Sequence, residues 1–175
     1  MSSAESPNGS AVVAGHAASG RSDHDEQPHR PAHAGHAERA QPATMTVLVY
    51  SDDITTRERV RMAVGRRPVA DLPAIEYVEC ATQRAVVTAV DAGGIDVLIL
   101  DGEAVPTGGM GICRQLKDEI YNCPPVLILT GRRDDAWLAS WSRADAALPH
   151  PINGVSLAPA VAELMRRRLA HEPVR

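Results

Sequence analysis

From Met45 onward, short apolar runs alternate with stretches in which apolar residues recur every three or four positions. Short apolar runs are typical of buried strands, and the longer spacing is typical of helices that cover a core with one face. The pattern predicts strands at 47–50, 75–80, 96–100, 125–129 and 146–148. It predicts helices at 55–66, around 86–90, and at 112–120, 134–142 and 155–169, with Asp134 as the cap of the fourth helix.

The alternation of strands and helices predicts one parallel sheet with helices on both faces, a doubly wound α/β fold. In such sheets the functional crevice lies beyond the carboxyl ends of the strands. Asp52, Asp101 and Thr130 each follow the carboxyl end of a predicted strand. We therefore expect these three polar side chains to converge at one edge of the sheet, where two carboxylates indicate a metal or phosphoryl site.

The composition changes near Met45. Residues 1–44 are rich in Ala, Gly, Ser, Pro and His, and they carry almost no large apolar side chains. This composition predicts a disordered arm at 1–44 ahead of a folded domain at 45–175. The arm contains five of the seven histidines, so it is interpreted as a flexible tail or, alternatively, as a metal-binding tract: His16, His24, His29, His33 and His36.

Charge and composition exclude several classes of protein. Lys and Arg number 18 against 22 for Asp and Glu, so the chain has no electrostatic footprint for a nucleic-acid partner. No apolar run approaches the length that spans a bilayer, which predicts no direct membrane insertion and a cytoplasmic location. The cysteines lack metal-ligand spacing and are interpreted as reduced core residues: Cys80, Cys113 and Cys123.

Four segments, in this order and spacing, resemble the receiver domains of bacterial response regulators. They are the first strand with its acidic cluster at 47–53, the strand ending in Asp101 at 95–101, the strand and turn at 126–131, and the segment at 144–151 that ends in His150-Pro151. The resemblance covers residues 45–170. It implies the flavodoxin-like (βα)5 receiver fold with strand order 2-1-3-4-5.

The resemblance also implies roles for individual residues. Asp101 stands at the position of the phospho-acceptor, which takes a phosphoryl group from a histidine kinase. Asp52, Asp101 and the backbone carbonyl of Glu103 stand where receivers hold Mg²⁺, an ion that prefers oxygen ligands. Thr130 and His150 stand at the two positions that sense the phosphoryl group.

Several residues depart from the receiver pattern. Ser51 replaces an acidic residue, His150 replaces a lysine, and Ala147 replaces an aromatic residue that turns inward on phosphorylation. Imidazole is shorter than a lysine side chain and largely uncharged near pH 7. Asp101 and Pro106 are also one residue further apart than in the family. Together these departures predict a degenerate site, with Mg²⁺ as the only cofactor in question.

The acidic residues also have purely structural interpretations. Asp52 and Asp53 would cap the helix that follows them, because a carboxylate at a helix N-terminus is stabilising. A carboxylate at the end of a buried strand costs free energy unless something pairs with it. Asp101 is therefore expected to meet either a residual metal ion or a partner such as His150.

Trp137 and Trp141 are four residues apart and share one face of the fourth predicted helix. Tryptophan is enriched where proteins bind one another, and this helix belongs to the usual output surface of receivers. The pair is thus a candidate partner-binding site. Simple packing in the core is the alternative.

Three short strings are similar to a group of mycobacterial stand-alone receiver-like proteins that are linked with respiratory complex I, the proton-pumping NADH:quinone oxidoreductase. They are Tyr50-Ser51-Asp52, the string at 100–104 and the string at 137–142. The resemblance implies an accessory subunit on the cytoplasmic side, peripheral to the inner membrane through its protein partner. No output domain follows residue 175, so we expect any signal to leave through a partner.

The sequence therefore favours a non-enzymatic interaction module that acts without phosphorylation. The alternative is a single-domain response regulator that is phosphorylated on Asp101 in a two-component phosphorelay. An enzyme on the same scaffold is a remote third hypothesis, because Ser51-Asp52-Asp53 stands where a glycine-rich nucleotide loop would follow the first strand.

Overall fold

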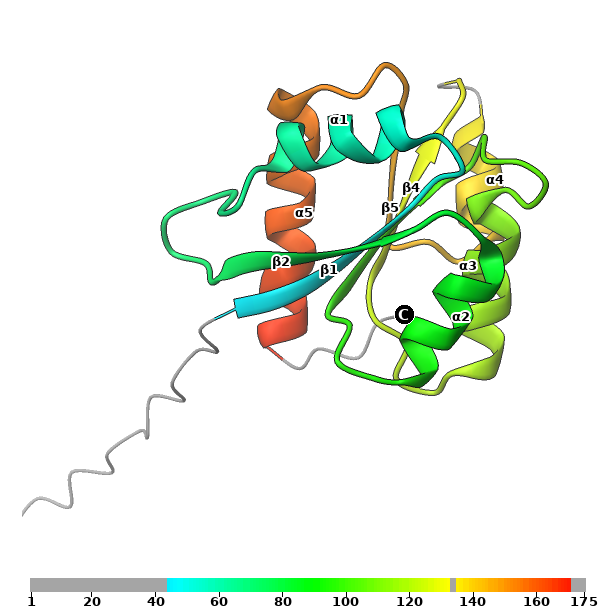
Figure 1. Cartoon of the computed structure of the whole chain (residues 1–175), viewed down its shortest axis with the longest axis horizontal. Coiled ribbons are helices and arrows are strands. Elements are labelled where there is room, and N and C mark those ends of the chain that lie inside the picture. The colour runs from blue at the N-terminus through cyan, green and yellow to red at the C-terminus, as the bar shows by residue number, and fades with distance from the viewer. Residues whose placement is uncertain (1–43, 133–134, 171–175) are drawn as a thin grey trace, which may run out of the picture. The chain divides into compact units, whose positions relative to one another are not determined.

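The computed structural model describes residues 44–132 and 135–170, which form a five-stranded parallel sheet flanked by helices (Figure 1). The strand order is β2-β1-β3-β4-β5, and every neighbouring pair is parallel. The predicted doubly wound, flavodoxin-like fold is confirmed. The strands are β1 (Thr44–Tyr50), β2 (Ala74–Cys80), β3 (Val97–Asp101), β4 (Val126–Thr130) and β5 (Ala146–Pro149). The helices are α1 (Ile54–Val64), α2 (Gln83–Asp91), α3 (Gly109–Glu119), α4 (Ala136–Trp141) and α5 (Gly154–Leu169).

Helices cover both faces of the sheet. One face packs against α1 and α5, and the other packs against α2 and α3 (Figure 1). Helix α4 contacts β4, β5 and α3. Every residue of the central strands β3 and β4 is buried, because strands of a parallel sheet are covered from both sides.

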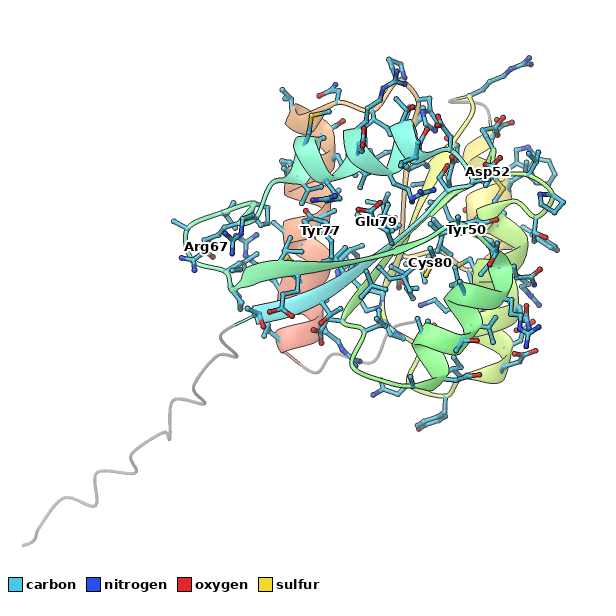
Figure 2. The ribbon with its side chains drawn as sticks, viewed as in Figure 1. Tyr50, Asp52, Arg67, Tyr77, Glu79 and Cys80 are labelled. Atoms are coloured by element: carbon cyan, nitrogen blue, oxygen red, sulfur yellow. The ribbon has the colours of Figure 1, made fainter. Side chains whose placement is uncertain are left out.

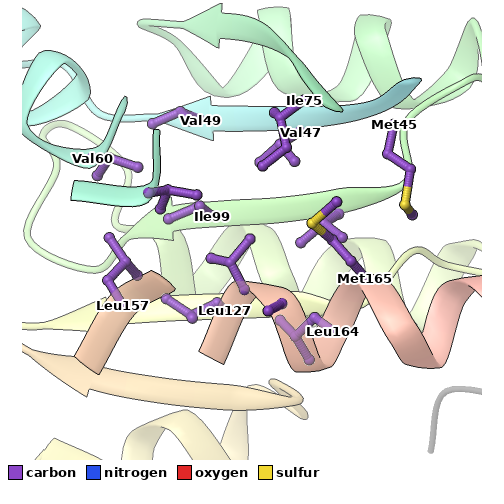
Figure 3. Packing of buried hydrophobic residues seen from close by; sticks show 14 of the residues in the cluster. Met45, Val47, Val49, Val60, Ile75, Ile99, Leu127, Leu157, Leu164 and Met165 are labelled. Atoms are coloured by element: carbon purple, nitrogen blue, oxygen red, sulfur yellow. The ribbon is translucent and has the colours of Figure 1, made fainter. Parts of the chain in front are cut away.

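Alternation along each strand divides the apolar residues between two cores. In β1, Val47 and Val49 face α1 and α5, whereas Leu48 and Tyr50 face α2 and α3. Figure 3 shows the first of these cores, in which the strands meet side chains of α1 and α5. Its labelled members include Val47, Val49, Val60, Ile99, Leu127, Leu157, Leu164 and Met165.

Strand β1 and helix α3 each begin three residues earlier than the apolar pattern predicts. Strand β1 starts at Thr44, because its first residues pair with the start of β2 from Ala74 onward. Helix α3 starts at Gly109, where a β-carbon would lie 2.7 Å from the carbonyl oxygen of Asp101. The apolar pattern cannot predict this start, because Gly109 has no apolar side chain and packs its backbone directly on β3.

Helix α4 is shorter than the predicted helix at 134–142. It spans Ala136–Trp141, and Asp135 occupies the N-cap position without a side-chain cap. The carboxylate of Asp135 instead accepts a hydrogen bond from the backbone N–H of Arg132 at 3.0 Å. Asp134, the predicted cap, lies outside the described residues, as do the predicted arm up to residue 43 and its five histidines.

Across residues 44–132 and 135–170, no helix combines the length and apolar character needed to cross a bilayer.

Candidate functional site

The carboxyl ends of β1, β3 and β4 meet at one edge of the sheet, as predicted. Ser51 follows β1, Asp101 ends β3 and Thr130 ends β4. All three are buried, with Asp101 only 4% exposed. Asp52 lies at the same edge but faces solvent (Figure 2). The edge therefore holds one buried carboxylate between two hydroxyl side chains, instead of the expected pair of converging carboxylates.

Two neutral donors bind the Asp101 carboxylate. The Ser51 hydroxyl donates to Oδ2 at 2.8 Å, and the backbone N–H of Glu103 donates to Oδ1 at 3.0 Å. His150 Nε2 stands 3.5 Å from Oδ1. That nitrogen is buried and makes no hydrogen bond within the described part of the chain. Asp101 is thus satisfied chiefly by Ser51 and a backbone amide, a pairing that the sequence did not suggest.

Ser51 is held in place by its own neighbours. Its backbone carbonyl accepts a hydrogen bond from Arg57 Nη1 at 2.6 Å, and its Oγ accepts one from the backbone N–H of Asp53 at 3.2 Å. The hydroxyl proton is consequently free to point at Asp101. An acidic residue at this position would place a second negative charge beside a buried carboxylate, whereas serine supplies a donor.

Asp53 caps helix α1. Its carboxylate accepts hydrogen bonds from the backbone N–H of Thr55 at 2.9 Å and from the Thr56 hydroxyl at 3.1 Å. The Thr55 N–H holds the pKa of Asp53 below its ordinary value. The capping interpretation is therefore confirmed for Asp53. Asp52 does not act as the cap, and its carboxylate makes no hydrogen bond or ion pair among the described residues.

Tyr50 is a site residue that sequence reasoning missed. It is buried at the end of β1, and its hydroxyl donates to the backbone carbonyl of Thr107 at 2.5 Å. Burial raises the pKa of Tyr50, and the charges of Asp52 and Asp101 raise it further. This hydrogen bond connects β1 to the loop after β3. The same loop contains the additional residue between Asp101 and Pro106. The sequence did carry a signal for this role, because Tyr50 is an aromatic residue at the end of an otherwise aliphatic run.

Glu103 lies in that same loop and reaches across to β4. Its carboxylate packs on the backbone of Gly131, where a β-carbon would lie 2.6 Å from Glu103 Cδ. A side chain at Gly131 would therefore force Glu103 to move. The loop after β3 is held from two sides, by Tyr50 and by this contact with the turn after β4.

Thr130 and His150 flank a hollow on the β5 side of the site. The Thr130 hydroxyl donates to the carbonyl of Arg132 at 3.1 Å, and the Thr130 carbonyl accepts from the backbone N–H of His150 at 2.8 Å. Both residues line a cavity of about 670 Å³, to which Ala147 contributes only a methyl group. The receiver resemblance implies that Ala147 replaces an aromatic residue, and here only its methyl group lines the cavity on this side.

The donor set does not fit a magnesium site. Among the described residues Asp101 is the only buried carboxylate at this edge, and Ser51 places a neutral hydroxyl where a second carboxylate would hold the ion. Asp52 is exposed. No three His, Cys, Asp or Glu side chains within 44–132 and 135–170 are close enough to share an ion. Mg²⁺ demands near-octahedral oxygen ligands, and the described residues at this edge do not supply them.

The two tryptophans lie on the surface. Trp137 is 66% exposed and Trp141 is 55% exposed, so the core-packing interpretation is wrong for both. The guanidinium of Arg114 stands over the Trp141 ring, 5.8 Å from its centre, and Arg114 Nη1 donates to the Trp141 carbonyl at 3.1 Å. This contact fixes one ring of the pair while leaving its outer face open.

No protein-family model matches the chain. Two proteins of Mycobacterium tuberculosis, strains CDC 1551 and H37Rv, are each 59% identical over 122 residues, which cover 70% of this chain and 92% of theirs. Both are described as uncharacterized response regulatory proteins.

The fold is similar to solved receiver structures. A chemotaxis response regulator of Vibrio cholerae aligns with a TM-score of 0.59 and 19% identity, covering 69% of this chain and 98% of its own. A putative response regulator of Chloroflexus aurantiacus aligns with a TM-score of 0.61 and 20% identity, covering 71% and 99%. At these identities the likeness concerns the fold alone.

Proposed function

The chain belongs to the response-regulator receiver family, and we propose that it is a non-enzymatic interaction module that acts without phosphorylation. It binds a protein partner through a fixed surface. The family's phosphorylation site is retained in position, and its polar groups are used to stabilise the fold.

The hydrogen bond from Ser51 to Asp101 carries this proposal. A carboxylate that attacks a phosphoryl group needs nearby cations, because the reaction brings negative charges together. Here both Asp101 oxygens are occupied by neutral donors, and His150 supplies no permanent charge at the lysine position. Among the described residues, no lysine or arginine forms an ion pair with Asp101.

Exposure of Trp137 and Trp141 supports the binding role. Large exposed apolar groups on a protein surface mark interaction sites, and tryptophan is enriched among residues that dominate binding energy. The stack of Arg114 on Trp141 lowers the conformational freedom that binding would otherwise remove. Helix α4 with these two residues is the proposed docking surface.

Respiratory complex I is the proposed partner, with this chain as an accessory subunit on its cytoplasmic side. This finer assignment rests on the likeness of the strings at 50–52, 100–104 and 137–142 to mycobacterial receiver-like proteins linked with that enzyme. Under the alternative function, a histidine kinase would phosphorylate Asp101. Asp52, Glu103, Thr130 and His150 would then act as metal and phosphate contacts.

A small phosphodonor separates the two functions. Incubated with Mg²⁺ and acetyl phosphate or phosphoramidate, the wild-type chain should show no phosphoryl adduct by intact mass. The matched gain-of-function variant combines Ser51→Asp with His150→Lys, which restores an acidic residue and a cation, and it should acquire an adduct. An adduct on the wild-type chain that disappears in Asp101→Asn would refute the phosphorylation-independent role.

Purification from native membranes tests the proposed partner. A tagged full-length chain should co-elute with NADH:quinone oxidoreductase activity after mild detergent extraction, and it should remain bound without added phosphodonor. Asp101→Asn should co-elute equally well, because the proposed role does not use the carboxylate as a nucleophile. Recovery of the chain only as free protein, with the oxidoreductase activity elsewhere in the gradient, would exclude the subunit assignment.

A further inference from the structure

Helix α1 and strand β2 form a second surface, which none of the receiver features explains. A hollow of about 360 Å³ lies between them, on the sheet face opposite α2 and α3. We call it the α1–β2 groove. Its lining residues are Glu58, Arg61, Met62, Gly65, Arg66 and Tyr77.

The walls of the α1–β2 groove are held in one arrangement. The Tyr77 hydroxyl donates to the carbonyl of Gly65 at 2.6 Å, and the Arg61 guanidinium lies 5.8 Å from the centre of the Tyr77 ring. Arg61 also pairs with Glu79 at 2.7 Å. Burial raises the pKa of Tyr77 to about 12, so its hydroxyl keeps its proton. A surface fixed in advance loses little conformational freedom when it binds.

The rim of the groove is basic although the whole chain is acidic. Five arginines and one glutamate occur between residues 54 and 67, while the chain carries a net charge of −4. Arg57 and Arg61 share Glu79 as their partner. Arg59, Arg66 and Arg67 are exposed, and within the described residues they form no ion pair. Of these, Arg66 lines the groove together with Glu58, Arg67 follows it in the sequence, and Arg59 lines a separate hollow with His150.

Apolar side chains from both elements line the groove. Met62 is 76% exposed, an unusual degree for a methionine, and it faces the same hollow as the Tyr77 ring. Arg66 lies just beyond the end of α1 and lines the hollow together with Met62. A flexible thioether beside an aromatic ring fits apolar side chains of different shapes.

We propose that the α1–β2 groove binds an acidic segment of a partner protein. One apolar side chain of that segment enters the hollow between Met62 and Tyr77, and neighbouring carboxylates of the segment pair with Arg66 and Arg67. An anionic membrane is the other source of negative charge. A hollow between Met62 and a Tyr77 ring held by Gly65 and Arg61 can receive an apolar side chain, which favours a protein.

The test uses the full-length chain labelled with ¹⁵N and a synthetic peptide of four acidic residues around one leucine. Amide signals of Met62, Gly65, Arg66 and Tyr77 should shift on titration, and the affinity should fall as salt rises. Replacing the leucine by serine, or the acidic residues by lysine, should abolish the shifts. Arg66→Glu should weaken binding at least about tenfold, whereas the matched reversal Arg84→Glu on α2 should not.

Three results would overturn the proposal. They are no shift in the α1–β2 groove up to about 1 mM peptide, equal binding by the Arg66→Glu chain, or binding to anionic phospholipid vesicles without binding to the peptide. Trp137→Ala should bind the peptide as the wild type does. This variant separates a failure of the α1–β2 groove from a failure of the α4 docking surface, so the two proposals can be rejected independently.

Discussion

Replacing Asp145 by alanine should remove about 3–5 kcal/mol from the free energy of unfolding. Lys117 Nζ lies 2.7 Å from Asp145 Oδ2, and both side chains are almost fully buried, at 4% and 6% exposure. The same oxygen accepts the backbone N–H of Val126 at 2.7 Å. Alanine would leave a buried ammonium group without its counter-charge and a buried N–H without its acceptor, and each loss is costly.

Urea unfolding measures this effect. With a slope of about 1–3 kcal/mol per M, the midpoint for Asp145→Ala should fall by on the order of 2 M. Asp145→Asn keeps an acceptor for Val126 and should lose less. Asp118→Ala is the matched control, because Asp118 pairs with Arg114 and Arg143 while remaining 46% exposed, and its midpoint should barely change. A midpoint for Asp145→Ala within error of the wild type would contradict the buried-pair argument.

Replacing Trp137 or Trp141 by alanine should weaken binding to the proposed partner by about 2 kcal/mol, or about 30-fold in Kd. Both rings are more than half exposed in the free chain. A partner that covers them would remove a large apolar area from water, and the Arg114 stack presents the Trp141 ring ready for contact. The measurement is binding of each purified variant to membranes that contain NADH:quinone oxidoreductase.

Stability serves as the internal control for these variants. Because the rings are exposed, their loss should change the unfolding midpoint little, so weaker binding could not be attributed to unfolding. Tyr121→Ala is the matched surface control, since Tyr121 is a fully exposed aromatic residue after α3. If wild-type chain binds while both tryptophan variants bind equally well, α4 is not the docking surface, although the interaction itself would stand.

Local patterns predicted the elements well and their ends less well. Alternation and helical spacing depend only on neighbours in the sequence, so all five strands could be predicted from them. The spatial order of the strands, 2-1-3-4-5, was instead implied by the receiver resemblance. The start of α3 at Gly109 was not, because glycine carries no apolar signal and its place depends on contact with Asp101. The expected convergence of Asp101 and Thr130 at one edge follows from strand direction alone.

The contacts of the site were less accessible. Ser51 was recognised as the loss of a charge, but its role as the donor to Asp101 links residues 50 positions apart. Such a bond depends on how closely two strand ends approach each other. The Lys117–Asp145 pair carried no signal at all, because its residues appear in the sequence as ordinary surface charges and are buried only after α3 packs on β3 and β4.

The sequence by itself determined the order of the elements, the two faces of each strand and the position of Asp101, because side-chain alternation and chain direction are local properties. Only the tertiary structure decided how Asp101 is satisfied, that Trp137 and Trp141 face outward, and that α1 and β2 enclose a basic groove. The reason is physical. Burial and pairing depend on how each helix is rotated and placed on the sheet, and packing of the whole domain sets that placement.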